Sequence, residues 1–303
     1  MILDFHTLDV FTGQRFAGNP LAVVLAADAL DTERMQAIAR EFNLSETVFV
    51  TKPINPAHSA RIRIFTPMTE LPFAGHPTVG TAVLMAELRM GGAANDHDAI
   101  IALEETIGIV RVGVRLRHGQ PGFAEFDAPH VPAEAGPPPP TERLAAALGL
   151  LPTEIGFSNH RPTQFSAGVP FTFVPVATLE AIAKANVQTS YWLSAFGPSG
   201  AGKAYLYCRE TMHNTASFHA RMFSPDSGNA EDPATGSAAA AFAGVLHRFD
   251  APLDGVHKRI IEQGYEMGRP SQVSLSLEIV RGALQSVRIG GSAVRVSEGR
   301  ITV

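Results

Sequence analysis

The sequence predicts a mixed α+β protein built from two similar halves, and three observations lead to that prediction. Glycine and proline account for 27 and 22 of the 303 residues, so turns are frequent and the elements between them short. Runs rich in β-branched and aromatic residues outnumber runs with helical periodicity. Several motifs also occur twice, in the same order, on either side of a proline-rich stretch. Each half is therefore expected to be one β-rich unit wrapped around a helix.

Strand signals follow one another along the chain, and helical signals are fewer. Alternating β-branched and aromatic residues predict strands over 5–11, 19–26, 46–51, 61–65, 108–117, 170–176, 203–209, 219–223, 271–280, 287–296 and 300–303. Apolar residues recurring at three- and four-residue steps predict helices over 31–42, 77–88, 141–150, 177–186 and 233–249.

A proline-rich stretch marks the boundary between the halves. Residues 127–141 read DAPHVPAEAGPPPPT and contain six prolines. Proline has no N–H to donate to a sheet, and such sequences behave as stiff, extended spacers. We therefore expect an N-terminal half over 1–126, a linker over 127–141 and a C-terminal half over 142–293.

The two halves repeat the same motifs. The pairs are GNPLAVVL (18–25) with GVPFTFVP (168–175), RIFTP (63–67) with RMFSP (221–225), and HPTVGTA (76–82) with DPATGSA (232–238). Two short amphipathic helices, containing ERMQAIA and LEAIAKA, follow the first pair. A repeat of this length indicates an internal duplication rather than a solenoid.

The duplication points to a site. Aligning HPTVGTA with DPATGSA puts His76 opposite Asp232, with helices starting at Gly75-His76-Pro77 and at Asp232-Pro233, where proline is favoured. The start of a helix attracts carboxylates. If the halves are related by a pseudo-twofold axis, both helix starts face one cleft. The small residues there, which would let a ligand approach the backbone, are Gly75, Gly80, Gly236 and Ser237.

Glu46 is the third candidate, and each candidate could also have a purely structural role. Glu46 lies between a predicted helix and an apolar strand, where burial would raise its pKa and let it take and return a proton. A glutamate that opens a strand is ordinarily only a polar surface residue. His76 could equally be a core or capping histidine, and Asp232 an ordinary helix N-cap. Their positions in a duplicated motif favour the functional interpretation.

Composition excludes several classes of protein. Twenty-four Lys and Arg against 29 Asp and Glu leave no basic excess for binding nucleic acid. No signal peptide is visible and the apolar runs are too short for a membrane helix, so we expect a cytoplasmic protein. The single cysteine, Cys208, excludes an intrachain disulfide framework and is expected to be a packed strand residue. The eleven histidines show no metal-ligand spacing.

One apparent nucleotide-binding motif is rejected. Residues 197–203 read GPSGAGK, close to a phosphate-binding loop, but Ala204 stands where a Ser or Thr is required. The YLYC that follows predicts a strand, whereas that motif requires a helix.

The chain resembles a known family. The segments GNPLAVVL, NLSETVFV, RIRIFTPMTELPFAGHPTVGTA, RMFSPDSGNAEDPATGSAAA and GRPSQVSLSLE are similar to those of the PhzF-like (phenazine-biosynthesis) isomerases, which have the diaminopimelate-epimerase-like fold. The resemblance extends nearly from end to end. It implies two pseudo-symmetric domains, each a curved, mostly antiparallel sheet or barrel around a central helix. It also implies a final strand, 294–303, that returns to the first domain, and a homodimer.

The resemblance implies roles for the candidate residues. Glu46 matches the family's acid–base carboxylate, with Ser45 before it. His76, preceded by Gly75, and Asp232 match the residues that hold and polarise the substrate. Gly236 and Ser237 match helix-start residues that bind its carboxylate.

The expected activity is therefore an isomerisation. The family's phenazine-biosynthesis enzyme acts on trans-2,3-dihydro-3-hydroxyanthranilate, a small cyclic carboxylate, and no metal, flavin or nicotinamide is implied. Related racemases use two cysteines, which this chain lacks. Two alternatives remain open, an epimerase of amino or hydroxy acids and a non-catalytic binding protein on the same fold.

Overall fold

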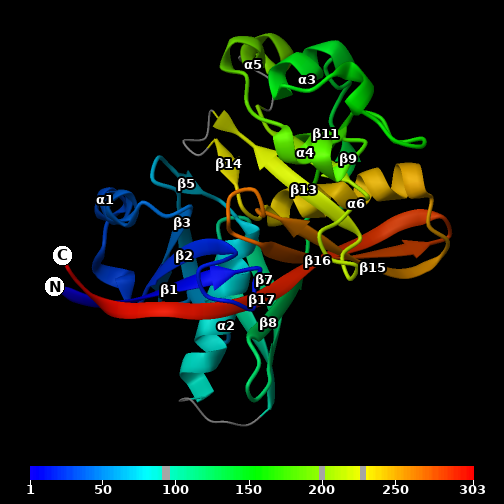
Figure 1. Cartoon of the computed structure of the whole chain (residues 1–303). Helices are drawn as coiled ribbons and strands as arrows, with labels where there is room; N and C mark the ends of the chain where they lie inside the picture. Colours follow the sequence, from blue (N-terminus) through cyan, green and yellow to red (C-terminus); the bar gives the residue numbers. More distant parts are fainter. Residues whose placement is uncertain (91–95, 198–201, 226–229) are drawn as a thin grey trace. The chain divides into compact units, whose positions relative to one another are not determined.

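The chain forms two compact units in a computed structural model that describes residues 1–90, 96–197, 202–225 and 230–303 (Figure 1). Unit 1 comprises Met1–Asp127, Arg269–Gln272 and Gly290–Val303, and unit 2 comprises Ala128–Gly268 and Val273–Ile289. Strands and helices are mixed in both units, which confirms the predicted α+β class. Within the described ranges, no helix has the length and hydropathy that crossing a membrane requires.

Unit 1 is a closed ring of strands. Its elements are β1 (Ile2–Val10), β2 (Asn19–Val24), η1 (Ala27–Ala29), α1 (Thr32–Phe42), β3 (Glu46–Thr51), β4 (Ala60–Phe65), β5 (Glu70–Leu71), α2 (Gly75–Met90), β6 (His97–Glu105), β7 (Gly108–Leu116) and β8 (Gly122–Asp127), with the end of β17 (Ala283–Thr302). The pairing runs β1–β2–β3–β4–β6–β7–β8–β17, and β17 pairs with β1 to close the ring.

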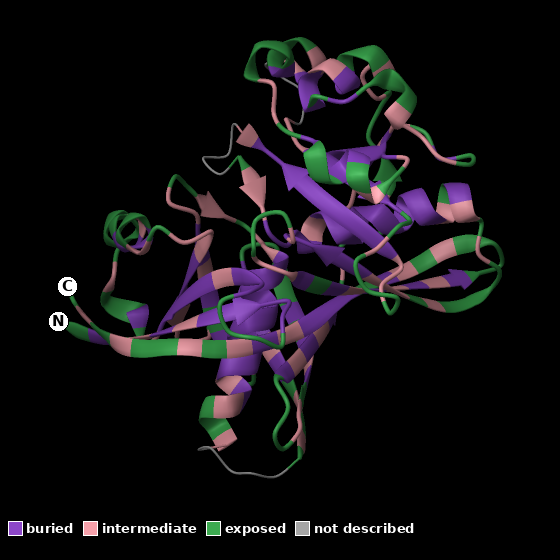
Figure 2. Ribbon diagram, viewed as in Figure 1, coloured by how far each residue is buried: buried purple, intermediate pink, exposed green. Residues whose placement is uncertain are grey.

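Two pairs in this ring are parallel, and each needs a crossover. α1 connects β2 to β3, and α2 connects β4 to β6. α2 contacts β1, β2, β3, β6, β7 and β8, and nearly all its residues from Gly75 to Ala86 are buried (Figure 2). A helix that is apolar on every side is typical of a protein interior. The strands of unit 1 therefore surround α2.

Unit 2 repeats this order of ladders. Its elements are β9 (Ala133–Glu134), α3 (Thr141–Leu148), η2 (Pro152–Glu154), β10 (Thr163–Ser166), β11 (Pro170–Pro175), α4 (Leu179–Lys184), α5 (Thr189–Phe196), β12 (Ala204–Cys208), β13 (Phe218–Phe223), β14 (Glu231–Asp232), α6 (Gly236–Asp250), β15 (Gly255–Gln263) and much of β16 (Ser271–Val280) and β17. β10–β11 and β12–β13 are antiparallel, and β11–β12 and β13–β15 are parallel. α4 and α5 make the first parallel crossover and α6 the second.

The residue register of these ladders matches the duplication in most places. Ala22 pairs with Thr47 in unit 1 and Thr172 with Ala204 in unit 2. Arg61 pairs with Glu104, and His219 with Glu262. The repeated motifs GNPLAVVL/GVPFTFVP and RIFTP/RMFSP therefore occupy equivalent strands.

The alignment of the two repeated motifs at the helix starts was wrong by five residues. The first helix begins at Gly75, as predicted, but the second begins at Gly236 with Thr235 as its N-cap, and Asp232 lies in β14. The short strands Glu70–Leu71 and Glu231–Asp232 each precede their helix by the same interval. Asp232 is therefore the counterpart of Leu71, and the counterpart of His76 is Ser237.

The proline-rich stretch is more than a spacer. Ala133–Glu134 form β9, which pairs antiparallel with Phe165 and Ser166 of β10, and Ala135 N–H donates to Gln164 O. The expectation that this stretch donates no ladder hydrogen bond was therefore wrong. Residues between its prolines retain N–H groups, and β10 offers them acceptors.

The last element links the two units along the chain. The two strands expected over 287–296 and 300–303 are one strand, β17. Its final part pairs with β1 from Ala293–Val10 to Thr302–Ile2, with one register shift. Residues 290–303 therefore complete unit 1, although unit 2 precedes them in the chain.

Candidate active site

Glu46 and His76 come together inside unit 1. Glu46 is the first residue of β3 and pairs with Leu21 of β2, while His76 is the second residue of α2. His76 Nε2 lies 3.1 Å from Glu46 Oε2, and the two side chains are 6% and 16% exposed. The structure thus joins two predicted site residues that are 30 positions apart in the chain.

His76 is held as a neutral imidazole. Burial lowers its pKa to about 3, and a hydrogen bond from the ring to the backbone carbonyl of Pro20 offsets only part of this effect. A neutral ring adds no positive charge beside Glu46. Because the single N–H of the neutral ring is donated to Pro20 O, the nitrogen that faces Glu46, Nε2, is an acceptor.

The first turn of α2, at Gly75 and His76, adds backbone donors beside this pair. The N–H groups in the first turn of a helix have no acceptor within the helix, and they carry partial positive charge. Gly75 and His76 lie in that turn and are buried, and Ser45, directly before Glu46, is half-buried. Gly80, in contrast, has a packing role: a Cβ there would lie 2.6 Å from Leu21 Cδ2 and 2.7 Å from Val10 Cγ2.

Unit 2 gathers the other predicted residues around the start of α6. Thr235 Oγ1 donates to Asp232 Oδ2 at 2.6 Å, and Gln263 Nε2 donates to Asp232 O at 2.8 Å and to Thr235 Oγ1 at 3.0 Å. Gly236 is buried and Ser237 half-buried in the first turn of the helix. That these residues and the Glu46–His76 pair line one cleft stays a prediction.

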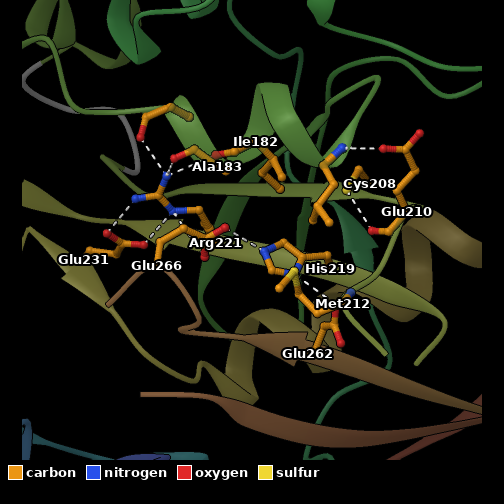
Figure 3. A network of polar contacts seen from close by, with 12 residues as sticks. Ile182, Ala183, Cys208, Glu210, Met212, His219, Arg221, Glu231, Glu262 and Glu266 are labelled. Carbon is orange, nitrogen blue, oxygen red and sulfur yellow. Dashed lines mark hydrogen bonds and ion pairs between the residues drawn. The ribbon is translucent and has the colours of Figure 1, made fainter. Parts of the chain in front are cut away.

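A network of charged side chains supports β14 from the neighbouring strand (Figure 3). Arg221 of β13 binds Glu231, the residue directly before Asp232, through two hydrogen bonds of 2.7 and 2.9 Å. It also donates to the carbonyls of Ile182, Ala183 and Ala185. Arg63 holds Glu70 of β5 in the same bidentate way in unit 1, with bonds of 2.7 and 2.6 Å.

His219 extends this network on β13. It contacts Glu262 at 3.0 Å and Glu266 at 2.8 Å (Figure 3). Burial lowers its pKa, but the hydrogen bonds and charges of the two glutamates outweigh that effect and raise the pKa to about 9. His219 is therefore an imidazolium that neutralises part of the acidic cluster behind the start of α6.

Sequence reasoning missed three polar residues near the helix starts. Glu105 hydrogen-bonds to Thr78 in the first turns of α2, and Gln263 has the same register position in unit 2. Lys203 occupies the position equivalent to Glu46. Each of them directly precedes one of two equivalent strand residues, Ala204 and Thr47. The doublets Glu104-Glu105 and Glu262-Gln263, at the ends of apolar strands, were the available signal.

Three further features considered in the sequence can be compared with the structure: a metal site, a reactive cysteine and a phosphate-binding loop. Among the described residues, no group of three or more His, Cys, Asp or Glu side chains is arranged to hold a metal ion. Burial raises the pKa of the Cys208 thiol to about 12, and the thiol donates to Glu210 O, so Cys208 is a packed strand residue. Part of the GPSGAGK segment, 198–201, lies outside the described residues, and a strand, β12, follows it.

Comparison with known proteins assigns the chain to a class and then to a family. A solved structure of a PhzF-family phenazine biosynthesis protein from Bacillus anthracis matches over 100% of both chains, with a TM-score of 0.89 and 26% identity. The sequence pattern of the phenazine biosynthesis-like (PhzC–PhzF) family matches residues 8–299. The chain belongs to this family, and it is an isomerase of it.

Two curated relatives are similar over nearly their whole length. An uncharacterised isomerase of Mesorhizobium japonicum is 53% identical, with 97% of each chain covered. The trans-2,3-dihydro-3-hydroxyanthranilate isomerase of Pseudomonas aeruginosa is 34% identical, with 98% of each chain covered.

Proposed function

We propose that the protein is a cofactor-free isomerase that moves a proton on a small, cyclic, carboxylated substrate, with Glu46 as the acid–base group. The observation that carries the proposal is the half-buried Glu46 carboxyl group, 3.1 Å from a neutral His76 at the start of a buried helix. The P. aeruginosa relative supplies the substrate class, trans-2,3-dihydro-3-hydroxyanthranilate.

The proposed reaction is a proton shift within the ring. The Glu46 carboxylate removes the hydrogen from C3, and the electron pair of that C–H bond moves into the diene. The resulting carboxylic acid returns the proton to C1, and the enol that forms becomes a ketone. The reaction is balanced without an oxidant or a reductant. One carboxyl group acts first as base and then as acid.

The barrier in such a reaction is the weak acidity of a C–H bond. A carboxylate held against that hydrogen replaces a bimolecular encounter by a local proton transfer. Negative charge that spreads into the ring is stabilised by N–H groups and dipoles already in place. In this proposal His76 and Asp232 hold and polarise the substrate, with Ser45 and Gly75 beside the first pair. The start of α6, at Gly236 and Ser237, binds the substrate carboxylate.

The decisive experiment is turnover in D2O. Wild type, Glu46→Gln and the matched surface control Glu41→Gln are incubated with trans-2,3-dihydro-3-hydroxyanthranilate in a buffer containing a metal chelator, and the ring protons are followed by NMR. General acid–base groups typically contribute about 10²–10⁴-fold, so we expect Glu46→Gln to lower turnover by at least about 100-fold. Substrate affinity should change by less than about tenfold.

The same spectra distinguish an isomerase from an epimerase and from a binding protein. Deuterium entering the carbon that lost its hydrogen, with no shift of the double bonds, would identify an epimerase. An equal loss of turnover and affinity in Glu46→Gln would make Glu46 a binding residue. No turnover by folded wild type would remove this substrate, and binding without turnover of other small carboxylates would favour a binding protein.

A further inference from the structure

Glu105 is a carboxyl group buried behind the start of α2. It is the last residue of β6 and is 9% exposed. Its Oε1 lies 2.8 Å from the hydroxyl oxygen of Thr78, which itself lies 2.8 Å from the carbonyl oxygen of Ala74. Thr78 is fully buried, and Ala74 precedes Gly75 and His76. The contact therefore connects β6 to the turn at which the candidate site begins.

The hydrogens in this chain of contacts favour a protonated Glu105. The Thr78 hydroxyl has one hydrogen, and both neighbours, the Ala74 carbonyl and an ionised Glu105, would be acceptors. A carboxylic acid resolves the conflict, because it donates to Thr78 Oγ1 while the hydroxyl donates to Ala74 O. Glu105 Oε2 has no hydrogen-bond partner in the part of the chain that the structure describes, a costly arrangement for a buried charge.

Among the described residues, the strand positions that neighbour Glu105 on its own face carry no charge to compensate an ionised form. Side chains alternate along strands, so Ile101, Leu103 and Glu105 of β6 share the face that packs against α2 with Ala60 and Ile62 of β4. The neighbouring ionisable side chains on the strands lie at alternate positions, toward the opposite face: Arg61 and Arg63 of β4, Glu104 of β6 and Arg111 of β7. Gly108 of β7 lies opposite Glu105.

On the helix side, the titratable groups near the start of α2 are His76, which is neutral above about pH 3, and Glu46 of β3, which lies 3.1 Å from it. Burial is the largest influence on the pKa of Glu105 and raises it to about 8. Glu105 is thus the group at this helix start that changes charge between neutral and alkaline pH.

The second unit has a neutral side chain at the same place. Glu104 and Glu262 are equivalent in the parallel ladders β4–β6 and β13–β15, so Glu105 is equivalent to Gln263. The amide of Gln263 donates to Thr235 Oγ1 and to Asp232 O, in the turn before α6. An uncharged donor therefore supports the turn before the helix in unit 2.

We propose that Glu105 is a positioning residue: a neutral carboxylic acid that donates to Thr78, fixes the Ala74–His76 turn and so places His76 against Glu46. Its effect on catalysis rests on the proposed function. Ionisation would remove the donor and place a negative charge behind the helix start, where substrate charge is to be stabilised. The isomerase should therefore lose activity as Glu105 ionises.

The test compares wild type, Glu105→Gln and the exposed control Glu33→Gln. Glutamine keeps the size and the donor but cannot ionise. Wild type and the control should lose kcat about tenfold between about pH 7 and 9, as a pKa of about 8 requires. Glu105→Gln should match wild type within about twofold at pH 7 and keep that activity at pH 9. An alkaline loss that persists in Glu105→Gln, or a large loss at pH 7 in a folded variant, would overturn the proposal.

A second measurement needs no substrate. Wild-type protein at neutral pH should show an infrared band of a buried carboxylic acid that is missing from Glu105→Gln and disappears with a midpoint near pH 8. If wild-type protein lacked this infrared band, Glu105 would be ionised and the inference would be contradicted. Turnover that depends on Glu46 would still stand in that case. Conversely, the band would support a protonated Glu105 even if the substrate proved wrong.

Discussion

His76 keeps one charge state over the whole physiological range, and this follows from its position rather than from its partner. Most of its shift in pKa comes from burial at the start of α2. A carboxylate beside an imidazolium would form an ion pair, whereas Glu46 faces a neutral ring. The pair can therefore exchange a proton with a ligand without first separating two opposite charges.

The same burial predicts how acid destabilises the protein. In the unfolded chain His76 takes up a proton near pH 6.5, but in the folded chain only near pH 3. Its contribution to the free energy of unfolding is thus present above about pH 6.5 and is lost as the pH falls toward 3, by up to about 1.4 kcal/mol per pH unit. His76→Gln should lose less stability on acidification than wild type, measured by urea unfolding from pH 7 to 4. The exposed control His118→Gln should behave as wild type, and parallel curves for all three would contradict the burial of a neutral His76.

The contribution of Glu105 to the free energy of unfolding depends on pH in the opposite direction. Its pKa is raised from 4.5 in the unfolded chain to about 8, so its contribution is complete below about pH 4.5 and is lost as the pH rises through 8. The two buried groups at the start of α2 therefore favour the folded state most strongly in different pH ranges. Both are neutral between about pH 5 and 7, so neither His76 nor Glu105 adds a charge at this helix start in that range.

At the scale of elements, α2 depends on close packing against the strands that surround it. Gly80 faces Leu21 and Val10, which are both fully buried. Gly80→Ala adds a methyl group to this contact, and overpacking of this kind costs about 1–3 kcal/mol, against at most about 1 kcal/mol gained in helix propensity. We expect a net loss of stability in urea unfolding. Gly113→Ala in β7, whose added Cβ would meet only Glu125 O at 3.8 Å, should be close to neutral. Equal effects of the two substitutions would contradict the packing role.

The strands were easier to predict than the starts of helices. Segments 46–51 and 61–65 were predicted almost to the residue, because both are rich in β-branched and aromatic side chains. The strands β6, β8, β10 and β15 and the helix α5 were missed, as were the two-residue strands β5, β9 and β14. β6 has charged residues at both ends of its apolar run, and α5 (TSYWLSAF) has no charged face to reveal a helical period. The start of α6 was misplaced because Asp-Pro is a common helix opening, whereas ladder bonds from Met222 and Phe223 draw Glu231–Asp232 into a strand.

The candidate residues were predictable as a set, but their geometry was not. Glu46 and His76 were chosen from motif positions, and their 3.1 Å contact depends on the parallel pairing of β2 with β3 beside α2. No local pattern encodes that pairing. Glu105 and Gln263 were missed because their importance comes from a ladder register between strands that are about 40 residues apart in the chain.

At the scale of the molecule, the two units share a topology but differ in chemistry. Where unit 1 has Glu46 and His76, the equivalent positions in unit 2 have Lys203 and Ser237. The proposed acid–base group and its histidine are thus both in unit 1. Unit 2 offers a hydroxyl and a lysine side chain at the equivalent positions, together with the N–H groups of a helix start.

The expected homodimer is a prediction at the same scale. Light scattering coupled to size-exclusion chromatography should give about twice the 32.3 kDa mass of the chain, independent of loading over about a tenfold range. A mass of one chain at all concentrations would contradict it.

The path of β17 has a consequence for synthesis on the ribosome. The residues that pair with β1 lie within 293–302 and are made after unit 2, and the ring of strands around α2 is open until they arrive. Domains commonly fold as they emerge, N-terminal first. Here the unit that emerges first is completed last, so its exposed strand edges must avoid wrong partners while the whole of unit 2 is translated. A nascent chain stalled just short of β17 would therefore be the form of this protein most exposed to chaperones and proteases.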